Sequence, residues 1–108
     1  MVDPPVPEEL RDYLGHLRER VSGALGDDLL GLWMIGSAAQ GAYEHGVSDV
    51  DIVAVTRERW PADARQSLGE SIVHPRFPCP AVGLEFVWYA APDLESLADP
   101  VAFQLNVN

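Results

Sequence analysis

The segment "IGSAAQGAYEHGVSDVDIVAV", residues 35–55, joins two apolar runs through a polar turn. A Gly-Ser pair closes the first run, and Asp49-Val50-Asp51 opens the second. In a strand, residues i and i+2 point to the same face, so Asp49 and Asp51 project side by side if the strand begins near Ser48. Adjacent carboxylates repel one another, and a divalent cation removes that conflict. The segment therefore predicts a metal site at the start of a strand.

Apolar patterning on both sides of this segment predicts the order of the elements. Apolar residues at three- and four-residue spacing indicate helices, whereas short β-branched or aromatic runs indicate strands. Helices are expected over 7–26 and from Pro61 through "ADARQSLGESI", and strands over 29–36, 50–55, 84–90 and 102–107. The first two strands are expected to be buried, and "APDLESLADP" is expected to be a polar connection or a short helical turn.

This order predicts an α/β (α+β) domain, with a mixed sheet of four to five strands flanked by two helices. Residues 1–108 are expected to form this single domain. Trp33, Phe86 and Trp88 are expected to pack in its core. The last strand runs to Asn108 without a cap or polar tail, so we expect the domain to be the N-terminal part of a longer protein.

Composition excludes several classes of function. The chain has 17 acidic and 7 basic residues and a net charge of −10, which argues against nucleic acid as a partner and favours a cationic ligand. All the basic residues are arginines, which excludes a Schiff-base or P-loop lysine. Cys79 is the one cysteine, and no apolar run is long enough for a membrane helix. A cytoplasmic location is therefore expected, while the oligomeric state stays open.

The Gly-Ser pair predicts an anion site next to the acids. Gly36 ends the first strand where backbone can approach a ligand closely. Residues 37–43 are expected to form a short helical turn whose first N–H groups, with the Ser37 hydroxyl, bind an anion. Mg²⁺ prefers carboxylate oxygens and usually shares its coordination sphere with phosphates. The two halves together predict a site for a nucleoside triphosphate.

Glu85 is a third candidate, because its neighbours in "VGLEFVWYA" are apolar. A carboxylate on a buried strand is costly unless it is paired, metal-bound or protonated. If its strand lies beside the strand of Asp49 and Asp51, Glu85 faces the same site. It would then be a metal ligand or a general base; the alternative is an edge carboxylate facing water. His74 and Cys79 share a Pro-rich loop but lack further ligands for zinc.

Gly36-Ser37, eleven intervening residues and Asp49-Val50-Asp51 resemble the signature of the nucleotidyltransferase superfamily with the DNA polymerase β-like fold. With Glu85 and "FQLNVN", the chain resembles the N-terminal domain of aminoglycoside nucleotidyltransferases, the streptomycin/spectinomycin adenylyltransferases in particular. The resemblance covers about residues 10–108. These families have a C-terminal helical domain that this sequence does not contain.

The resemblance implies an ATP-dependent enzyme that transfers AMP to a hydroxyl of a small molecule, with an aminoglycoside as acceptor and antibiotic resistance as its role. It implies that Asp49 and Asp51 bind Mg²⁺ and that Gly36, Ser37 and Ser48 contact the phosphates. Glu85 would act as the catalytic base or hold a second metal ion. Two alternatives remain open at this point: a minimal nucleotidyltransferase antitoxin that binds or modifies a helical toxin, and a silent domain that only binds nucleotide. Ser48 can also act only as the cap of a turn.

Overall fold

The computed structural model describes residues 8–36, 44–73, 78–81, 83–95 and 102–107. It contains a four-stranded sheet in the order β1-β2-β3-β4. The outer pairs are antiparallel and the central pair is parallel, which confirms the predicted mixed sheet. The elements are η1 Glu8–Leu10, α1 Arg11–Leu25, η2 Gly26–Asp28, β1 Leu29–Ile35, β2 Val50–Thr56, α3 Ala62–Ile72, β3 Leu84–Ala90, α4 Ala91–Glu95 and β4 Leu105–Val107.

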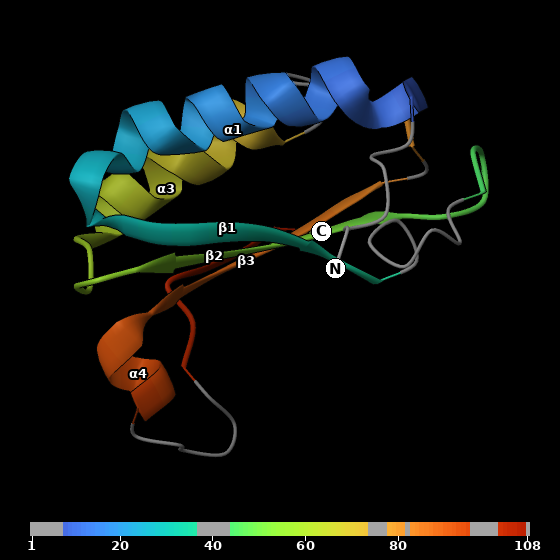
Figure 1. Cartoon of the computed structure of the whole chain (residues 1–108). Helices are drawn as coiled ribbons and strands as arrows, with labels where there is room; N and C mark the ends of the chain where they lie inside the picture. Colours follow the sequence, from blue (N-terminus) through green and yellow to red (C-terminus); the bar gives the residue numbers. More distant parts are fainter. Residues whose placement is uncertain (1–7, 37–43, 74–77, 82, 96–101, 108) are drawn as a thin grey trace.

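The helices lie on both faces of the sheet (Figure 1). Helices α1 and α3 run side by side over one face, whereas the short α4 lies beyond the other face at the end of β3. Helix α3 connects β2 to β3, because parallel neighbours need a crossover rather than a hairpin. It approaches β4 closely at Gly69, where a Cβ would lie 3.2 Å from Leu105 Cδ1. Two helices were predicted, and the described residues form three.

The core lies between the sheet and the helix pair α1 and α3. The predicted apolar stripe of α1 is buried there, together with Tyr13. Phe86 and Trp88 are fully buried on β3, as predicted. The Trp88 Nε1–H donates a hydrogen bond of 2.9 Å to Thr56 Oγ1, so the polar atom of the indole is satisfied inside the core. Burial of this one face holds the sheet against the helices.

The opposite face of the sheet, called the open face below, carries the other half of each strand. Along β2 buried and partly buried residues alternate, with Val50 and Ile52 under the helices and Asp51 and Val53 on the open face. The same alternation runs along β3. The open face therefore presents the side chains that the helices leave accessible.

Strand β1 differs from its prediction. It was expected to be buried, but it is an edge strand, and Trp33 is 50% exposed. Leu32 and Met34 pack against the core, so the alternation of the strand turns Trp33 to the open face. Its indole lies over Gly31, where a Cβ would overlap the ring. The prediction that Trp33 packs in the core is therefore wrong, although its strand assignment is confirmed.

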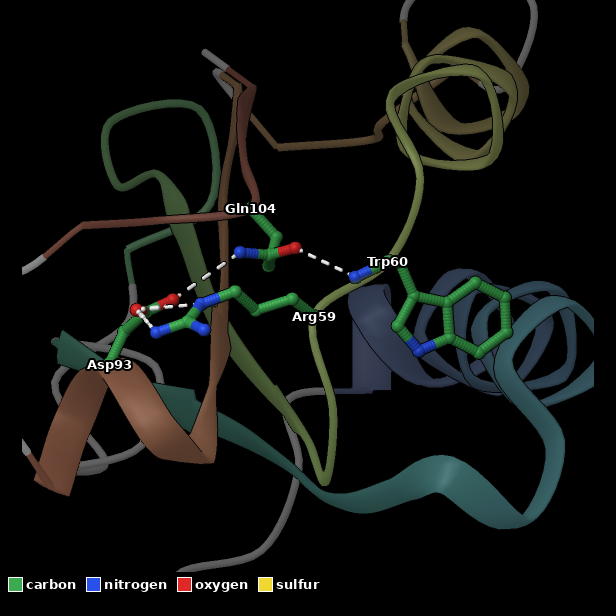
Figure 2. A network of polar contacts seen from close by, with 4 residues as sticks. All are labelled: Arg59, Trp60, Asp93 and Gln104. Atoms are coloured by element: carbon green, nitrogen blue, oxygen red, sulfur yellow. Dashed lines mark hydrogen bonds and ion pairs between the residues drawn. The ribbon is translucent and has the colours of Figure 1, made fainter.

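A polar network fastens α4 to the rest of the domain (Figure 2). The Arg59 guanidinium donates hydrogen bonds of 3.0 and 2.7 Å to Asp93 Oδ1. Gln104 donates to the other oxygen of Asp93 at 3.4 Å and accepts a hydrogen bond of 2.9 Å from the Trp60 amide. These contacts join the end of β3 to the connection between β2 and α3. Among the residues that the structure describes, no helix has the length and apolar character needed to cross a membrane.

Candidate functional site

Two of the three predicted carboxylates lie side by side on the open face. Strands β2 and β3 pair in parallel register, and Asp51 is directly opposite Glu85. On the other side of β2, Asp51 is opposite Ile35, the last residue of β1. Neighbouring strands lie about 4.8 Å apart, so side chains in one row of the sheet are in contact range. The condition set by the sequence, that the strand of Glu85 lies beside that of Asp51, is met.

The carboxyl groups of these two residues interact directly. The pKa of Glu85 is raised above its ordinary value, first because its carboxyl group hydrogen-bonds Asp51 and then because of the charge on Asp51. Desolvation and the charge on Asp49 raise it further, but they are the smaller causes. The Glu85 side chain is exposed, so burial among apolar neighbours, which the sequence suggested, is not what perturbs it. Two carboxylates in contact repel each other when both are ionised, and a cation bound between them would remove that repulsion.

Asp49 lies at the same end of the sheet but outside the strand. Strand β2 begins at Val50, one residue after Asp49, and the Asp49 side chain is exposed. Its Oδ1 lies 3.5 Å from the position that a Cβ on Gly83 would occupy. Asp49 is therefore placed against the segment entering β3, while Asp51 stands inside the sheet. The two acids therefore lie together at the entrance of β2.

Gly36 is fitted to Asp51 in two ways. Its φ of 75° lies in the left-handed region, which favours glycine. A Cβ at Gly36 would also collide with Asp51 Oδ2. Gly36, at the end of β1, thus brings bare backbone against the Asp51 carboxylate. Ser37 and the helical turn predicted over 37–43 lie outside the described residues.

Ser48 closes the turn that leads into β2. Its Oγ accepts a hydrogen bond of 3.1 Å from the Glu44 amide, and its own amide donates one of 2.9 Å to the Glu44 carbonyl. Gly46, inside this turn, has a φ of 85°. These two hydrogen bonds support the interpretation that Ser48 caps a turn, which the sequence left open.

The donor set fits a hard divalent cation that takes few protein ligands. Mg²⁺ is commonly held by one or two carboxylates and completes its sphere with water and phosphate oxygens. Asp51 and Glu85 supply carboxylate oxygens in contact, and Asp49 adds negative charge nearby. Within the described ranges, no three His, Cys, Asp or Glu side chains come close enough to hold a metal ion by themselves. This arrangement suits a cation bound together with a ligand better than a closed structural metal site.

Sequence reasoning missed two residues that shape this site. The Gly83 carbonyl accepts a hydrogen bond of 2.9 Å from the Val50 amide, which aligns the entrances of β2 and β3 beside Asp49. Ile35, 48% exposed, flanks Asp51 on the open face. For Gly83, the available signal was a glycine immediately before a strand. For Ile35, no pattern in the sequence distinguished it from a buried strand residue.

Comparison with known proteins identifies the fold. No family model matches the sequence, and no curated protein matches it. The structure is similar to the crystal structure of spectinomycin adenyltransferase AAD(9) from Enterococcus faecialis with ATP and spectinomycin, with a TM-score of 0.74 at 15% sequence identity. The match covers 91% of this chain and 41% of that protein, so this chain spans less than half its length. This chain has a nucleotidyltransferase-like fold.

Proposed function

We propose that this domain catalyses Mg²⁺-dependent transfer of a nucleoside monophosphate, AMP from ATP, to a hydroxyl group of a small molecule. The observation that carries the proposal is the contact between Asp51 and Glu85 on the open face, with the Gly36 backbone against the same carboxylate. Support also comes from the similarity to an adenyltransferase crystallised with ATP. An accessible pair of acids with the Gly36 backbone beside it is suited to binding a metal–triphosphate.

Each site residue has a role in this proposal. Asp51 and Asp49 hold the cation, and Glu85 stands beside them as base or additional ligand. The bound Mg²⁺ supplies positive charge that offsets the negative charge of the triphosphate. Gly36, Ser37 and Ser48 contact the phosphate groups through backbone and hydroxyl donors. Because Ser48 also caps the turn before β2, it would contribute by fixing the approach to Asp49.

Glu85 takes the proton in the transfer step. The acceptor oxygen forms a bond to the α-phosphorus of ATP, and the bond from that phosphorus to the bridging oxygen breaks. Pyrophosphate leaves, and the hydroxyl proton moves to the Glu85 carboxylate. Glu85 is directly opposite Asp51 in the sheet, so its carboxylate stands beside the proposed cation, where a base is needed. Its exposure leaves it accessible to an acceptor on the open face.

A cationic aminoglycoside is the proposed acceptor. The net charge of −10 attracts polycations, and three carboxylates gather at the strand entrances. The similar adenyltransferase was crystallised with spectinomycin, which supports an acceptor of this class. In this proposal residues 1–108 form an N-terminal nucleotidyltransferase domain, and a C-terminal helical domain closes over the acceptor.

Pyrophosphate release tests the proposed reaction. The chain, and any longer protein that contains it, is incubated with ATP, Mg²⁺ and a panel of aminoglycosides that includes spectinomycin and streptomycin. We expect acceptor-dependent release that falls on the order of 100-fold in Glu85→Gln. Glu58→Gln, on the exposed connection after β2, is the matched control and should keep full activity. A folded protein that binds ATP but turns over no acceptor refutes the aminoglycoside assignment; AMP transferred to a protein partner instead would favour the antitoxin alternative.

A further inference from the structure

A groove lies between helix α1 and strand β1, on the face of the sheet that the helices cover. It has a volume of about 640 Å³, and its lining includes Gly15 of α1, residues 32–34 of β1 and Ile52 of β2. Sites for small molecules typically have volumes of about 300–1,000 Å³, so the groove has the size of such a site. Ile52 is buried on the helix side of β2, whereas its neighbour Asp51 is on the open face. The groove is therefore separate from the candidate site.

The walls of this groove are apolar. Leu17 and Ile52 belong to the core, whereas Leu14, Leu32 and Met34 are only partly buried against it. These three side chains line the groove, so part of their apolar surface is accessible there. Removing such surface from water is favourable. The groove is therefore suited to a ligand with an apolar body.

Two arginines border the apolar walls. Arg11 and Arg18 both line the groove, and they lie on α1 two helical turns apart, roughly 10.5 Å along the axis. Both side chains are exposed, and within the described part of the chain neither forms an ion pair. Asp12 and Glu19 follow them in the sequence but do not line the groove, and no other acid is among its described lining residues. The groove therefore offers positive charge to a ligand.

We propose that this groove binds an amphipathic carboxylate, with the apolar part of the ligand against the walls and its carboxylate at the Arg11 or Arg18 guanidinium. A guanidinium holds a carboxylate through two parallel hydrogen bonds. The chain has a net charge of −10, so its field repels anions over most of the surface. Two of its seven arginines border this one groove, and they supply the local attraction that an anion needs.

A ligand in the groove does not compete with one at the candidate site. Asp51 and Glu85 lie on the open face, and the groove lies on the other side of the sheet. Met34 and Ile52, which line the groove, are directly opposite each other in the pairing of β1 with β2. The next pair in the same register is Ile35 with Asp51. The two sites are therefore back to back, and the inference does not rest on the proposed transfer reaction.

Calorimetric titration of the 108-residue chain with octanoate tests this site. Octyltrimethylammonium is the matched probe, because it has the same alkyl chain and the opposite charge. The net charge of the chain attracts the cation, whereas the groove selects the anion. We expect octanoate to bind at one site, more tightly than octyltrimethylammonium and more weakly as salt is added. Equal or tighter binding of octyltrimethylammonium overturns the proposal.

Arginine variants test the charged border of the groove. Arg11→Gln and Arg18→Gln should each weaken octanoate binding by about threefold, and the double variant by about tenfold, because exposed ion pairs contribute little individually. Arg57→Gln is the matched control, because Arg57 is exposed on the connection after β2 and does not line the groove. It should bind octanoate as the wild type does. Octanoate affinities that agree in the double variant and in Arg57→Gln contradict the proposal.

Gly15→Leu tests the apolar part of the groove. Gly15 lines the groove, and none of the described residues lies within 4 Å of its Cβ position, so a leucine there occupies the space of the ligand. Gly23 has equally open surroundings on the same helix but does not line the groove, so Gly23→Leu is the matched control. Leucine favours a helix more than glycine does, so both variants should fold, and circular dichroism checks this.

Gly15→Leu should abolish octanoate binding, and Gly23→Leu should leave it unchanged. Equal octanoate binding by the two variants overturns the proposal. An acidic amphipathic helical peptide is titrated in the same way. If that peptide binds the wild type but not Gly15→Leu, while octanoate does not bind at all, the groove is a protein-docking surface and its assignment to a small carboxylate is wrong.

Discussion

Replacing Gly36 by alanine tests two effects: the cost of a side chain at positive φ, and the collision of that side chain with the Asp51 carboxylate. Gly36 and Gly46 both have positive φ, at 75° and 85°. A Cβ at Gly36 would collide with Asp51 Oδ2, whereas a Cβ at Gly46 would have none of the described residues within 4 Å. The variants Gly36→Ala and Gly46→Ala therefore share one backbone cost and differ in whether a carboxylate is displaced.

The shared cost follows from the left-handed conformation. An L-residue in this region loses about 1–2 kcal/mol relative to glycine, and both variants should lose this much free energy of unfolding. For a domain of this size, that loss lowers Tm by roughly 4–16 °C. Gly36→Ala carries an additional cost, because either the turn or the Asp51 side chain must move. Moving Asp51 also breaks its contact with Glu85.

Urea denaturation and calorimetric titration with ATP in Mg²⁺ measure the two effects separately. We expect both variants to be destabilised, and we expect Gly36→Ala alone to bind Mg²⁺–ATP at least about tenfold more weakly than the wild type, a loss of about 1.4 kcal/mol. Nucleotide affinities that agree in Gly36→Ala and Gly46→Ala would refute the idea that Gly36 exists to admit the Asp51 carboxylate.

Three further predictions concern the pH dependence and stability of the domain. Because the folded state raises the pKa of Glu85, the free energy of unfolding without divalent cations should fall as pH rises from about 4.5 through that raised pKa. Urea titrations of Glu85→Gln should lack this decline, and identical pH profiles would contradict its assignment. Thr56→Val should cost about 1–3 kcal/mol in thermal or urea unfolding, because the buried Trp88 Nε1–H loses its acceptor; an unchanged midpoint would exclude that hydrogen bond. Arg59→Ala should leave the unfolding midpoint nearly unchanged in urea, because this guanidinium is largely solvated, and a large drop would mean that its contact with α4 is worth more than a surface ion pair.

The local elements of the fold were predictable, whereas the strand pairing on which the site depends was not. Periodicity identified α1 and α3, and short apolar runs identified the strands. From the sequence, Glu85 could be placed beside Asp51 only on the condition that their strands are neighbours. The register of two parallel strands depends on the crossover between them, and the sequence does not specify it. The structure supplies that register and places the two residues directly opposite each other.

The predictions that failed concern which face of the sheet is covered. Apolar neighbours suggested that Glu85 and Trp33 are buried, but both are on the open face, one exposed and one half exposed. A continuous apolar run in sequence does not tell which of its alternate residues the helices cover. The position of β1 at the edge depends on the order in which all four strands pair, so no single segment of the sequence predicts it.

The claim that acids at the entrance of β2 hold a cation together with a nucleotide is tested most directly with Mn²⁺ in place of Mg²⁺. Electron paramagnetic resonance reports the free Mn²⁺ that remains as protein is added in the presence of ATP. The wild type should remove Mn²⁺–ATP from solution, and Asp51→Asn should weaken that binding by at least about tenfold, since Mg²⁺-type sites depend on one or two carboxylates. Asp63→Asn, at an exposed acid in the first turn of α3, should bind as the wild type does. Equal Mn²⁺–ATP binding by wild type and Asp51→Asn would contradict the account.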